Sequence, residues 1–379
     1  MWKWGERPRV TSANEARIRQ ESVRLLEAGV SGRVFPGAVA CIAFRRGRSW
    51  SFVEATAGLL EPGGAKVTPA TVYDLASLTK SFVAVAALRM VEAGNLSLSA
   101  RADEELSDLR GSVAEGATLE NLLSHRAGLD AWGGLYLDVP PELGASAARR
   151  WMLGEAGRRT HEEPAGTCMY SDLGYMLAGE MIGRAAGGSL ADAVRTQVTE
   201  PLGIADDVRY IGALPAHERS QLARKAAPTE RCEWRGRVVR GEVHDENCAA
   251  LGGVSGHAGL FGVAKAVARF GTELLDVRAG RSDFIRESSL ERALKERPGG
   301  QRYRMGFDTK VGADSAMGKR SAASTFGHLG FTGTSYLCEP ERQVVMVLLT
   351  NRVHPSRANE KIRAFRPAFH DGVLAAFDG

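Results

Sequence analysis

The chain has 379 residues, of which 44% are hydrophobic and 25% are charged, and its formal net charge is +4. This composition is ordinary for a globular protein, and the length allows either two packed regions or one α/β body with a large insertion. The small net charge and the scattered lysines and arginines give no reason to expect a nucleic-acid partner. Five cysteines without a Cys-x-x-Cys pair disfavour a disulfide framework and a zinc site. We predict neither a metal nor a cofactor.

The first residues, Met1 to Pro8, lack the apolar core of a signal peptide, and no apolar run approaches membrane-spanning length. We therefore expect a cytoplasmic protein without a membrane span.

The N-terminal part of the chain alternates helix and strand signals. A solvent-facing helix is predicted over residues 12–28, followed by two strands over 38–44 and 51–57 that pair as an antiparallel hairpin. The helix that follows Ser77 is apolar on nearly every side and ends at Gly94, which indicates a central buried helix.

Beyond that helix the signals change twice. Strand patterns thin out after residue 102, where helical pieces with Gly- and Pro-rich joints take over. A helix with one apolar face closes the chain, with a kink or restart expected at Pro367. Before it, strands return at 302–308, 334–338 and 343–350, the last two as a hairpin.

Strands therefore come from both ends of the chain and helices from its middle. We predict an α+β fold in which residues 1–101 and 277–379 build an antiparallel sheet with flanking helices. Residues 102–276 are expected to form a mainly helical inserted region, with the active-site cleft between the two.

One motif points to chemistry, the segment Ala76-Ser77-Leu78-Thr79-Lys80 at the head of the buried helix. Residues three apart are neighbours on a helix, so Lys80 can take or polarise the proton of the Ser77 hydroxyl. About one Ser-x-x-Lys is expected by chance in a chain of this length, so the motif needs support from elsewhere.

Two later segments offer that support. Tyr170-Ser171-Asp172 opens a predicted helix, where the alternative is a packed Tyr with Ser171 or Asp172 as N-cap. In the segment 326–334, three glycines let a strand edge approach a ligand, and an exposed N–H there could complete an oxyanion hole. A structural turn is the alternative, and His328 alone is more often a structural histidine.

In this order the three segments resemble the serine β-lactamase and penicillin-recognising superfamily. The chain is similar to its class C-type serine hydrolases, which include family VIII esterases, D-aminopeptidases and D-Ala-D-Ala carboxypeptidases. Its Ser-x-x-Lys is Ser77 to Lys80, its Tyr-x-Asn corresponds to 170–172 and its Lys-Thr-Gly to 328–330. Further matching segments are 122–129, 170–179, 201–203 and 252–261.

The resemblance implies acyl transfer through a covalent intermediate. By analogy, Ser77 attacks a carbonyl carbon while Lys80 and Tyr170 move its proton, and the N–H groups of Ser77 and Phe331 hold the oxyanion. Water then attacks the acyl-enzyme with Tyr170 as base. Asp172, His328 and Gly330 are implied to contact the substrate.

Two positions depart from the family pattern. Asp172 replaces the usual Asn; a carboxylate beside Lys80 favours the ammonium form and shifts weight to Tyr170 as base. It also removes an amide donor for a substrate carbonyl. His328 replaces the Lys of Lys-Thr-Gly, so a fixed positive charge for a β-lactam carboxylate is missing, and we predict poor β-lactamase activity.

A His-Asp-Glu-Asn run at 244–247 does not fit a metal site, because contiguous residues cannot all face one ion on a regular element. We prefer a loop that borders the cleft, with Asn247 as a substrate-binding residue, over a plain solvated loop. His125 and His257 lie in glycine-containing turns and are expected to be structural.

We predict a serine hydrolase, most simply a carboxylesterase on small or short-chain esters, with a small ester or amide as its partner. A D-amino-acid peptidase, a D-Ala-D-Ala carboxypeptidase, a weak β-lactamase and an acyltransferase are the alternatives within enzymes. A peptidase working on cell walls would need a periplasmic location. A non-catalytic ligand-binding sensor is the alternative of another class; Asp172 supports it, and the retention of Ser77, Lys80 and Tyr170 opposes it.

Overall fold

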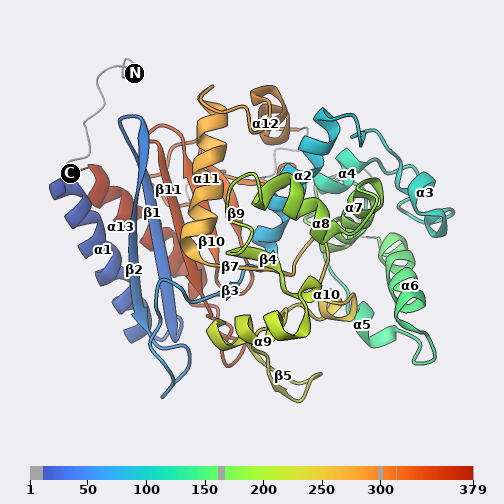
Figure 1. Cartoon of the computed structure of the whole chain (residues 1–379), viewed down its shortest axis with the longest axis horizontal. Coiled ribbons are helices and arrows are strands. Elements are labelled where there is room, and N and C mark those ends of the chain that lie inside the picture. Colours follow the sequence, from blue (N-terminus) through green and yellow to red (C-terminus); the bar gives the residue numbers. More distant parts are fainter. Residues whose placement is uncertain (1–11, 161–166, 298–301, 313, 379) are drawn as a thin grey trace.

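The computed structural model describes residues 12–160, 167–297, 302–312 and 314–378. Its centre is a six-stranded antiparallel sheet with the strand order β2-β1-β11-β10-β9-β8 (Figure 1). The strands are β1 (Gly37–Arg46), β2 (Ser49–Gly58), β8 (Asp308–Thr309), β9 (Phe326–Leu329), β10 (Ser335–Glu339) and β11 (Val344–Thr350). Both chain ends meet where β1 pairs with β11, so the predicted sheet from the two termini is confirmed. The N-terminal residues on which the localisation prediction depends lie outside the described ranges.

Helices cover both faces of this sheet. Successive side chains of a strand point to opposite faces, so Ile42 packs with α1 (Ser12–Ser31) and α13 (Ile362–Asp378), whereas Cys41 belongs to the core on the other side. Helix α11 (Ala264–Arg278) packs there against β1, β10 and β11. Most of this helix falls within the predicted helical region 102–276, yet its amphipathic face covers the sheet. Helix α13 continues through Pro367 without a restart.

Most of the helical region lies to the right of the six-stranded sheet in Figure 1. Its helices are α3 (Ala102–Glu105), α4 (Leu119–Leu123), α5 (Leu135–Asp138), α6 (Ala145–Arg158), α7 (Asp172–Ala185), α8 (Leu190–Val194), α9 (Ala216–Lys225) and α10 (Glu246–Ala250). The flanking segments add α2 (Thr79–Glu92) and α12 (Glu287–Leu294). Short strands β3 (Tyr73–Asp74), β7 (Leu260–Gly262) and β4 (Val208–Tyr210) form a small sheet, and β5 (Arg231–Cys232) pairs with β6 (Arg237–Val238).

The predicted strand at 302–308 is instead a tight turn that leads into the short edge strand β8. Gly306 has a φ of +80°, and a Cβ atom at this position would lie only 2.3 Å from Ala84 Cβ. The turn therefore passes directly against α2, and only Asp308 and Thr309 join the sheet.

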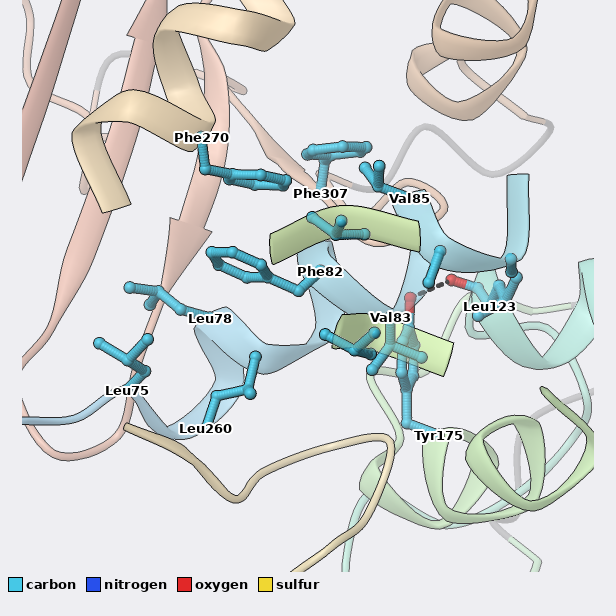
Figure 2. Packing of buried hydrophobic residues seen from close by; sticks show 14 of the residues in the cluster. Leu75, Leu78, Phe82, Val83, Val85, Leu123, Tyr175, Leu260, Phe270 and Phe307 are labelled. Carbon is cyan, nitrogen blue, oxygen red and sulfur yellow. Dashed lines mark hydrogen bonds between the residues drawn. The ribbon is translucent and has the colours of Figure 1, made fainter. Parts of the chain in front are cut away.

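Helix α2 is buried along almost its whole length, as predicted, and joins the two regions (Figure 2). On the sheet side the Phe82 ring stacks on Phe270 of α11, with ring centroids 4.0 Å apart. Towards the helical region it packs beside Tyr175 of α7, whose hydroxyl donates to the Leu123 carbonyl at 2.8 Å. Burial of each such large side chain contributes roughly 2 kcal/mol. This packing fixes the first turn of α2 between the two regions.

Within the described ranges, no helix has both the length and the apolar character needed to span a bilayer.

Candidate active site

Ser77 lies in a short 3₁₀ turn, Ala76–Leu78, that runs directly into α2. The residue before it, Ala76, has a φ of +48°, a backbone conformation that costs energy for any residue with a Cβ atom. The buried Asp74 carboxylate holds this turn, since it accepts hydrogen bonds from Ala76 N at 2.8 Å and His244 N at 2.6 Å. The hydrogen bonds of Asp74 hold this strained turn in place. The turn presents the Ser77 hydroxyl to the cleft, at the positive end of the α2 dipole.

The Lys80 side chain is completely buried directly beside Ser77. Its Nζ donates to Ser77 Oγ at 3.0 Å, to Asp172 Oδ1 at 2.6 Å and to the His257 carbonyl at 3.3 Å. All three protons of an ammonium group therefore have acceptors. Hydrogen bonds between the His257 ring and the side chains of Ser255 and Asp245 keep this residue in place, which is consistent with the predicted structural role.

Tyr170 and Asp172 stand where α7 begins, because Ser171 caps this helix by accepting from Gly174 N. The cap is the alternative that the sequence offered, and it coexists with a site role for its two neighbours. Lys80 Nζ lies 4.9 Å from the centroid of the Tyr170 ring. The ring also packs on the rings of His125, at 4.7 Å, and Tyr303, at 4.8 Å.

Burial and the nearby Asp172 carboxylate raise the pKa of Tyr170 well above its ordinary value, against a hydrogen bond with Ser77 that lowers it. A resting phenolate is therefore disfavoured. Tyr170 enters any reaction as a neutral phenol that can donate or relay a proton, and its role as the general base stays a prediction.

His328 lies on β9 with its side chain almost fully buried. Its Nδ1 is 2.9 Å from the Leu329 carbonyl, which selects the tautomer with the proton on Nδ1. Burial, followed by the charge of Lys80, lowers the pKa of His328 to about 3. The ring is neutral at physiological pH, so the position that carries Lys in the family motif provides no cation.

The turn after β9 is tied to the residues that precede Ser77. Thr332 Oγ1 donates to the Asp74 carbonyl at 2.8 Å, and Thr334 Oγ1 donates to the Leu75 carbonyl at 3.0 Å. Only glycine fits at 330, because a Cβ atom there would lie 2.0 Å from Thr334 Oγ1. These ties bring the Phe331 backbone to the Ser77 side of the cleft, while its role in an oxyanion hole stays a prediction.

These side chains surround one cleft of about 820 Å³. The predicted residues that line it are Ser77, Tyr170, Asp172, His328, Gly330 and Phe331, together with His244, Asp245 and Glu246 of the predicted border loop. Asn247 does not line the cleft. Its side chain is fully buried and bonded to the backbone of Gly133 and Tyr136, so the structure gives it a positioning role in place of the predicted substrate contact.

Sequence reasoning missed several lining residues, among them Trp132, Arg302, Tyr303 and Asp308. Trp132 follows a segment that matches the family, but nothing in its pattern marks it as part of a site. The other three lie in the turn that was predicted as a strand. Arg302 Nε is 3.3 Å from Asp308 Oδ1, and burial raises the pKa of Asp308 to about 6.

Among the residues that the structure describes, no three His, Cys, Asp or Glu side chains are grouped to hold a metal ion. The site instead combines a serine hydroxyl, a buried lysine, a carboxylate and a phenol around one cleft. This combination is typical of a serine hydrolase.

Comparison with known proteins agrees. The sequence model of the family described as Beta-lactamase matches residues 23–368, so the chain belongs to this family of serine hydrolases, which act on small esters and amides. A protein of Salmonella agona (strain SL483), described as "Putative D-alanyl-D-alanine carboxypeptidase", is 26% identical over 341 residues, which cover 82% of this chain and 75% of that protein.

Three solved structures share the fold. A class C β-lactamase superposes with a TM-score of 0.73 at 16% identity, covering 98% of this chain and 99% of the other. EstCE1, described as a hydrolase with promiscuous acyltransferase activity, gives 0.71 at 18% identity, with 96% and 100% covered. SurE gives 0.69 at 22% identity, with 95% and 77% covered.

Proposed function

We propose that the protein is a carboxylesterase that hydrolyses small esters through an acyl-enzyme on Ser77. The observation that carries the proposal is the neutral, buried His328 at the place where β-lactam recognition would use a cation. An ester needs no such charge, because its carbonyl oxygen is recognised by hydrogen-bond donors alone.

The hydrogen bonds of Lys80 support a short proton relay that begins at Ser77. As the Ser77 hydroxyl attacks the ester carbonyl, its proton moves to Lys80 Nζ, 3.0 Å away. Lys80 can accept it because it passes one of its own protons to the Asp172 carboxylate at 2.6 Å. The serine oxygen forms the new bond to carbon, and the developing oxyanion faces the N–H groups of Ser77 and Phe331.

Collapse of this intermediate breaks the bond to the leaving alkoxide, which takes a proton from the phenol of Tyr170 or from Lys80. Water then attacks the carbonyl carbon of the acyl-enzyme. The proton transfers run in the opposite direction, so that Ser77 recovers its proton as its bond to the acyl carbon breaks. A neutral phenol can protonate the leaving alkoxide. Tyr170 is neutral because its pKa lies well above its ordinary value.

A D-amino-acid peptidase or D-Ala-D-Ala carboxypeptidase is the second candidate. It is supported by the Salmonella relative, which covers 82% of this chain. A carboxypeptidase must also hold a substrate carboxylate, and the neutral His328 argues against this reading.

The test is turnover of p-nitrophenyl acetate and butyrate, with nitrocefin and D-alanyl p-nitroanilide alongside. Wild type is compared with Ser77→Ala and with Ser220→Ala, a control that removes a hydroxyl exposed on α9. Ester turnover that disappears only in Ser77→Ala supports the esterase. Preference for the anilide favours the peptidase, and stoichiometric labelling without turnover favours a ligand sensor.

We also propose a cytoplasmic location. All five cysteines are free and buried, which suits a reducing compartment. Fractionation of cells into periplasm and cytoplasm, with detection by antibody, tests this proposal.

A further inference from the structure

Two aromatic side chains stand exposed at the active-site cleft. Trp132 is 43% exposed and Phe331 is 51% exposed, and both line the cleft that contains Ser77. In the described part of the chain few large apolar side chains are this exposed: Val113, Trp132, Leu137, Trp234, Val311 and Phe331. Exposed aromatic surface that gathers at a cleft marks a ligand-binding surface more often than a stability feature.

The loop that carries Trp132 is anchored on both sides of this residue. On one side, Asp172 N donates to the Ala131 carbonyl at 2.8 Å. On the other, Asn247 Nδ2 donates to the Gly133 carbonyl at 2.6 Å, and Asn247 Oδ1 accepts from Tyr136 N at 3.1 Å. A fully buried amide is thus used to hold the loop, and the loop presents the indole to the cleft.

The Phe331 ring is held by a different set of contacts. Arg352 Nε donates to the Phe331 carbonyl at 2.8 Å, and the same guanidinium carbon lies 4.5 Å from the ring centroid. The His244 ring lies nearly parallel to the Phe331 ring, with centroids 5.7 Å apart. A cation–π contact and a stacked ring therefore keep an exposed phenyl group in one position.

Fixed, exposed aromatic surfaces bind flat apolar groups with little loss of side-chain entropy, because the ordering is already complete before the ligand arrives. We propose that Trp132 and Phe331 form an aryl-binding surface, and that the substrates are esters which carry an aromatic or similarly flat apolar group. The proposal rests on the proposed esterase function and narrows its substrate class. Trp132 follows Ala131, whose carbonyl accepts from Asp172 N, and it lines the same cleft as Ser77, so the proposal places the bound group near the reacting carbonyl.

The test compares ethyl acetate, ethyl phenylacetate and benzyl acetate, with acid release followed by pH-stat. The two aryl esters place the ring on the acyl or on the alcohol side, and ethyl acetate has no ring. Wild type is compared with Trp132→Ala and with Trp234→Ala. Trp234 is 46% exposed and does not line the cleft, so it is a matched control.

We expect wild type to prefer at least one aryl ester, and Trp132→Ala to lower the ratio of its kcat/KM to that for ethyl acetate roughly tenfold. Trp234→Ala should keep the wild-type ratio. Equal kcat/KM for all three esters in wild type would overturn the proposal, as would the same loss of ratio in both tryptophan variants.

A binding measurement separates this proposal from the esterase proposal. Calorimetry with the Ser77→Ala protein compares phenylacetate with acetate, and benzyl alcohol with ethanol. Tighter binding of an aryl ligand that is lost in Ser77→Ala/Trp132→Ala supports the aryl surface even if no ester is turned over. Equal affinity within both pairs contradicts the aryl surface, whether or not esters are hydrolysed.

Discussion

Lys80 Nζ lies 2.6 Å from Asp172 Oδ1, and the lysine side chain of this ion pair is completely buried. The related motif places an amide at position 172, so this chain sets a full negative charge against its lysine. A carboxylate stabilises the ammonium form, and it also offers a place to which the lysine can pass a proton. The pair therefore holds Lys80 beside Ser77 and gives the lysine an acceptor for one of its protons.

Replacement of Asp172 by Asn tests this pair. The amide keeps a hydrogen-bond acceptor but removes the charge that favours the ammonium form of Lys80. Because the amide cannot take the proton that Lys80 passes on, we expect kcat/KM for p-nitrophenyl acetate to fall about tenfold or more. Because a buried lysine loses its counter-charge, the variant should also be less stable by about 1–2 kcal/mol.

The matched control is Asp138→Asn, which removes the carboxylate of an exposed pair with Arg159. It should leave kcat/KM unchanged and alter the free energy of unfolding by no more than about 0.5 kcal/mol. An unchanged kcat/KM in Asp172→Asn would mean that the Asp172 carboxylate does not take the proton of Lys80 during the reaction.

Replacement of His328 by Lys tests the missing cation. The neutral imidazole of wild type offers no charge to a substrate carboxylate, since the pKa of His328 is lowered to about 3. We expect His328→Lys to raise kcat/KM for nitrocefin roughly tenfold, the effect of about 1.4 kcal/mol from a new ion pair in a partly buried site. His328→Gln, which stays neutral, is the control. Equal nitrocefin rates in the two variants would show that charge at this position does not limit β-lactam turnover.

The buried Asp308 makes stability depend on pH. Burial raises its pKa to about 6, although the charges of Arg302, Arg366 and Arg304 oppose this shift. At pH values between the unfolded pKa of about 3.9 and the folded pKa of about 6, the folded state binds the Asp308 proton more tightly than the unfolded state does. Stability therefore falls as pH rises through this window, by up to about 3 kcal/mol, and the loss is complete by about pH 7.

Asp308→Asn removes the charge that burial disfavours. Urea unfolding at pH 7 should show the variant to be more stable than wild type, and the difference should shrink at pH 4.5. The exposed Asp108 serves as the control, since Asp108→Asn should behave alike at both pH values. A variant that is less stable than wild type at pH 7 would show that the pairing with Arg302 outweighs the cost of burial.

The sequence was most informative where one pattern determines one element. The apolar run after Ser77 predicts the buried helix α2, and the hairpin signals at both chain ends predict the sheet. The resemblance locates Ser77, Tyr170 and His328, which line one cleft, and Lys80, which is buried directly beside Ser77. In each case a local periodicity or a local motif carries the information.

Other features depend on contacts between distant segments, which no local pattern records. Residues 302–308 look like a strand, yet Gly306 turns there because it packs against α2. Asn247 looks like a cleft residue, yet its amide is bonded to a loop more than a hundred residues earlier in the chain. The exposed Trp132 carries no signal at all, because only the completed fold shows that it borders Ser77.

Arg366 is a buried arginine of α13 that lines the cleft and bonds to the turn that carries Phe331. Its Nη2 donates to the carbonyls of Gly330 and Thr334, and burial lowers the pKa of Arg366 to about 9. These two bonds hold the turn that carries Phe331. If the Phe331 N–H binds the oxyanion, a loosened turn weakens a contact made mainly in the transition state.

We therefore expect Arg366→Met to lower kcat for p-nitrophenyl acetate about tenfold or more with little change in KM. Arg366→Lys keeps a positive charge but lacks the planar fork, so it should recover only part of kcat. Arg24→Met, which removes an exposed arginine of α1, is the control, and thermal melting shows whether each variant is folded. A folded Arg366→Met protein that changes KM and leaves kcat intact would mean that this arginine positions the substrate and not the oxyanion turn.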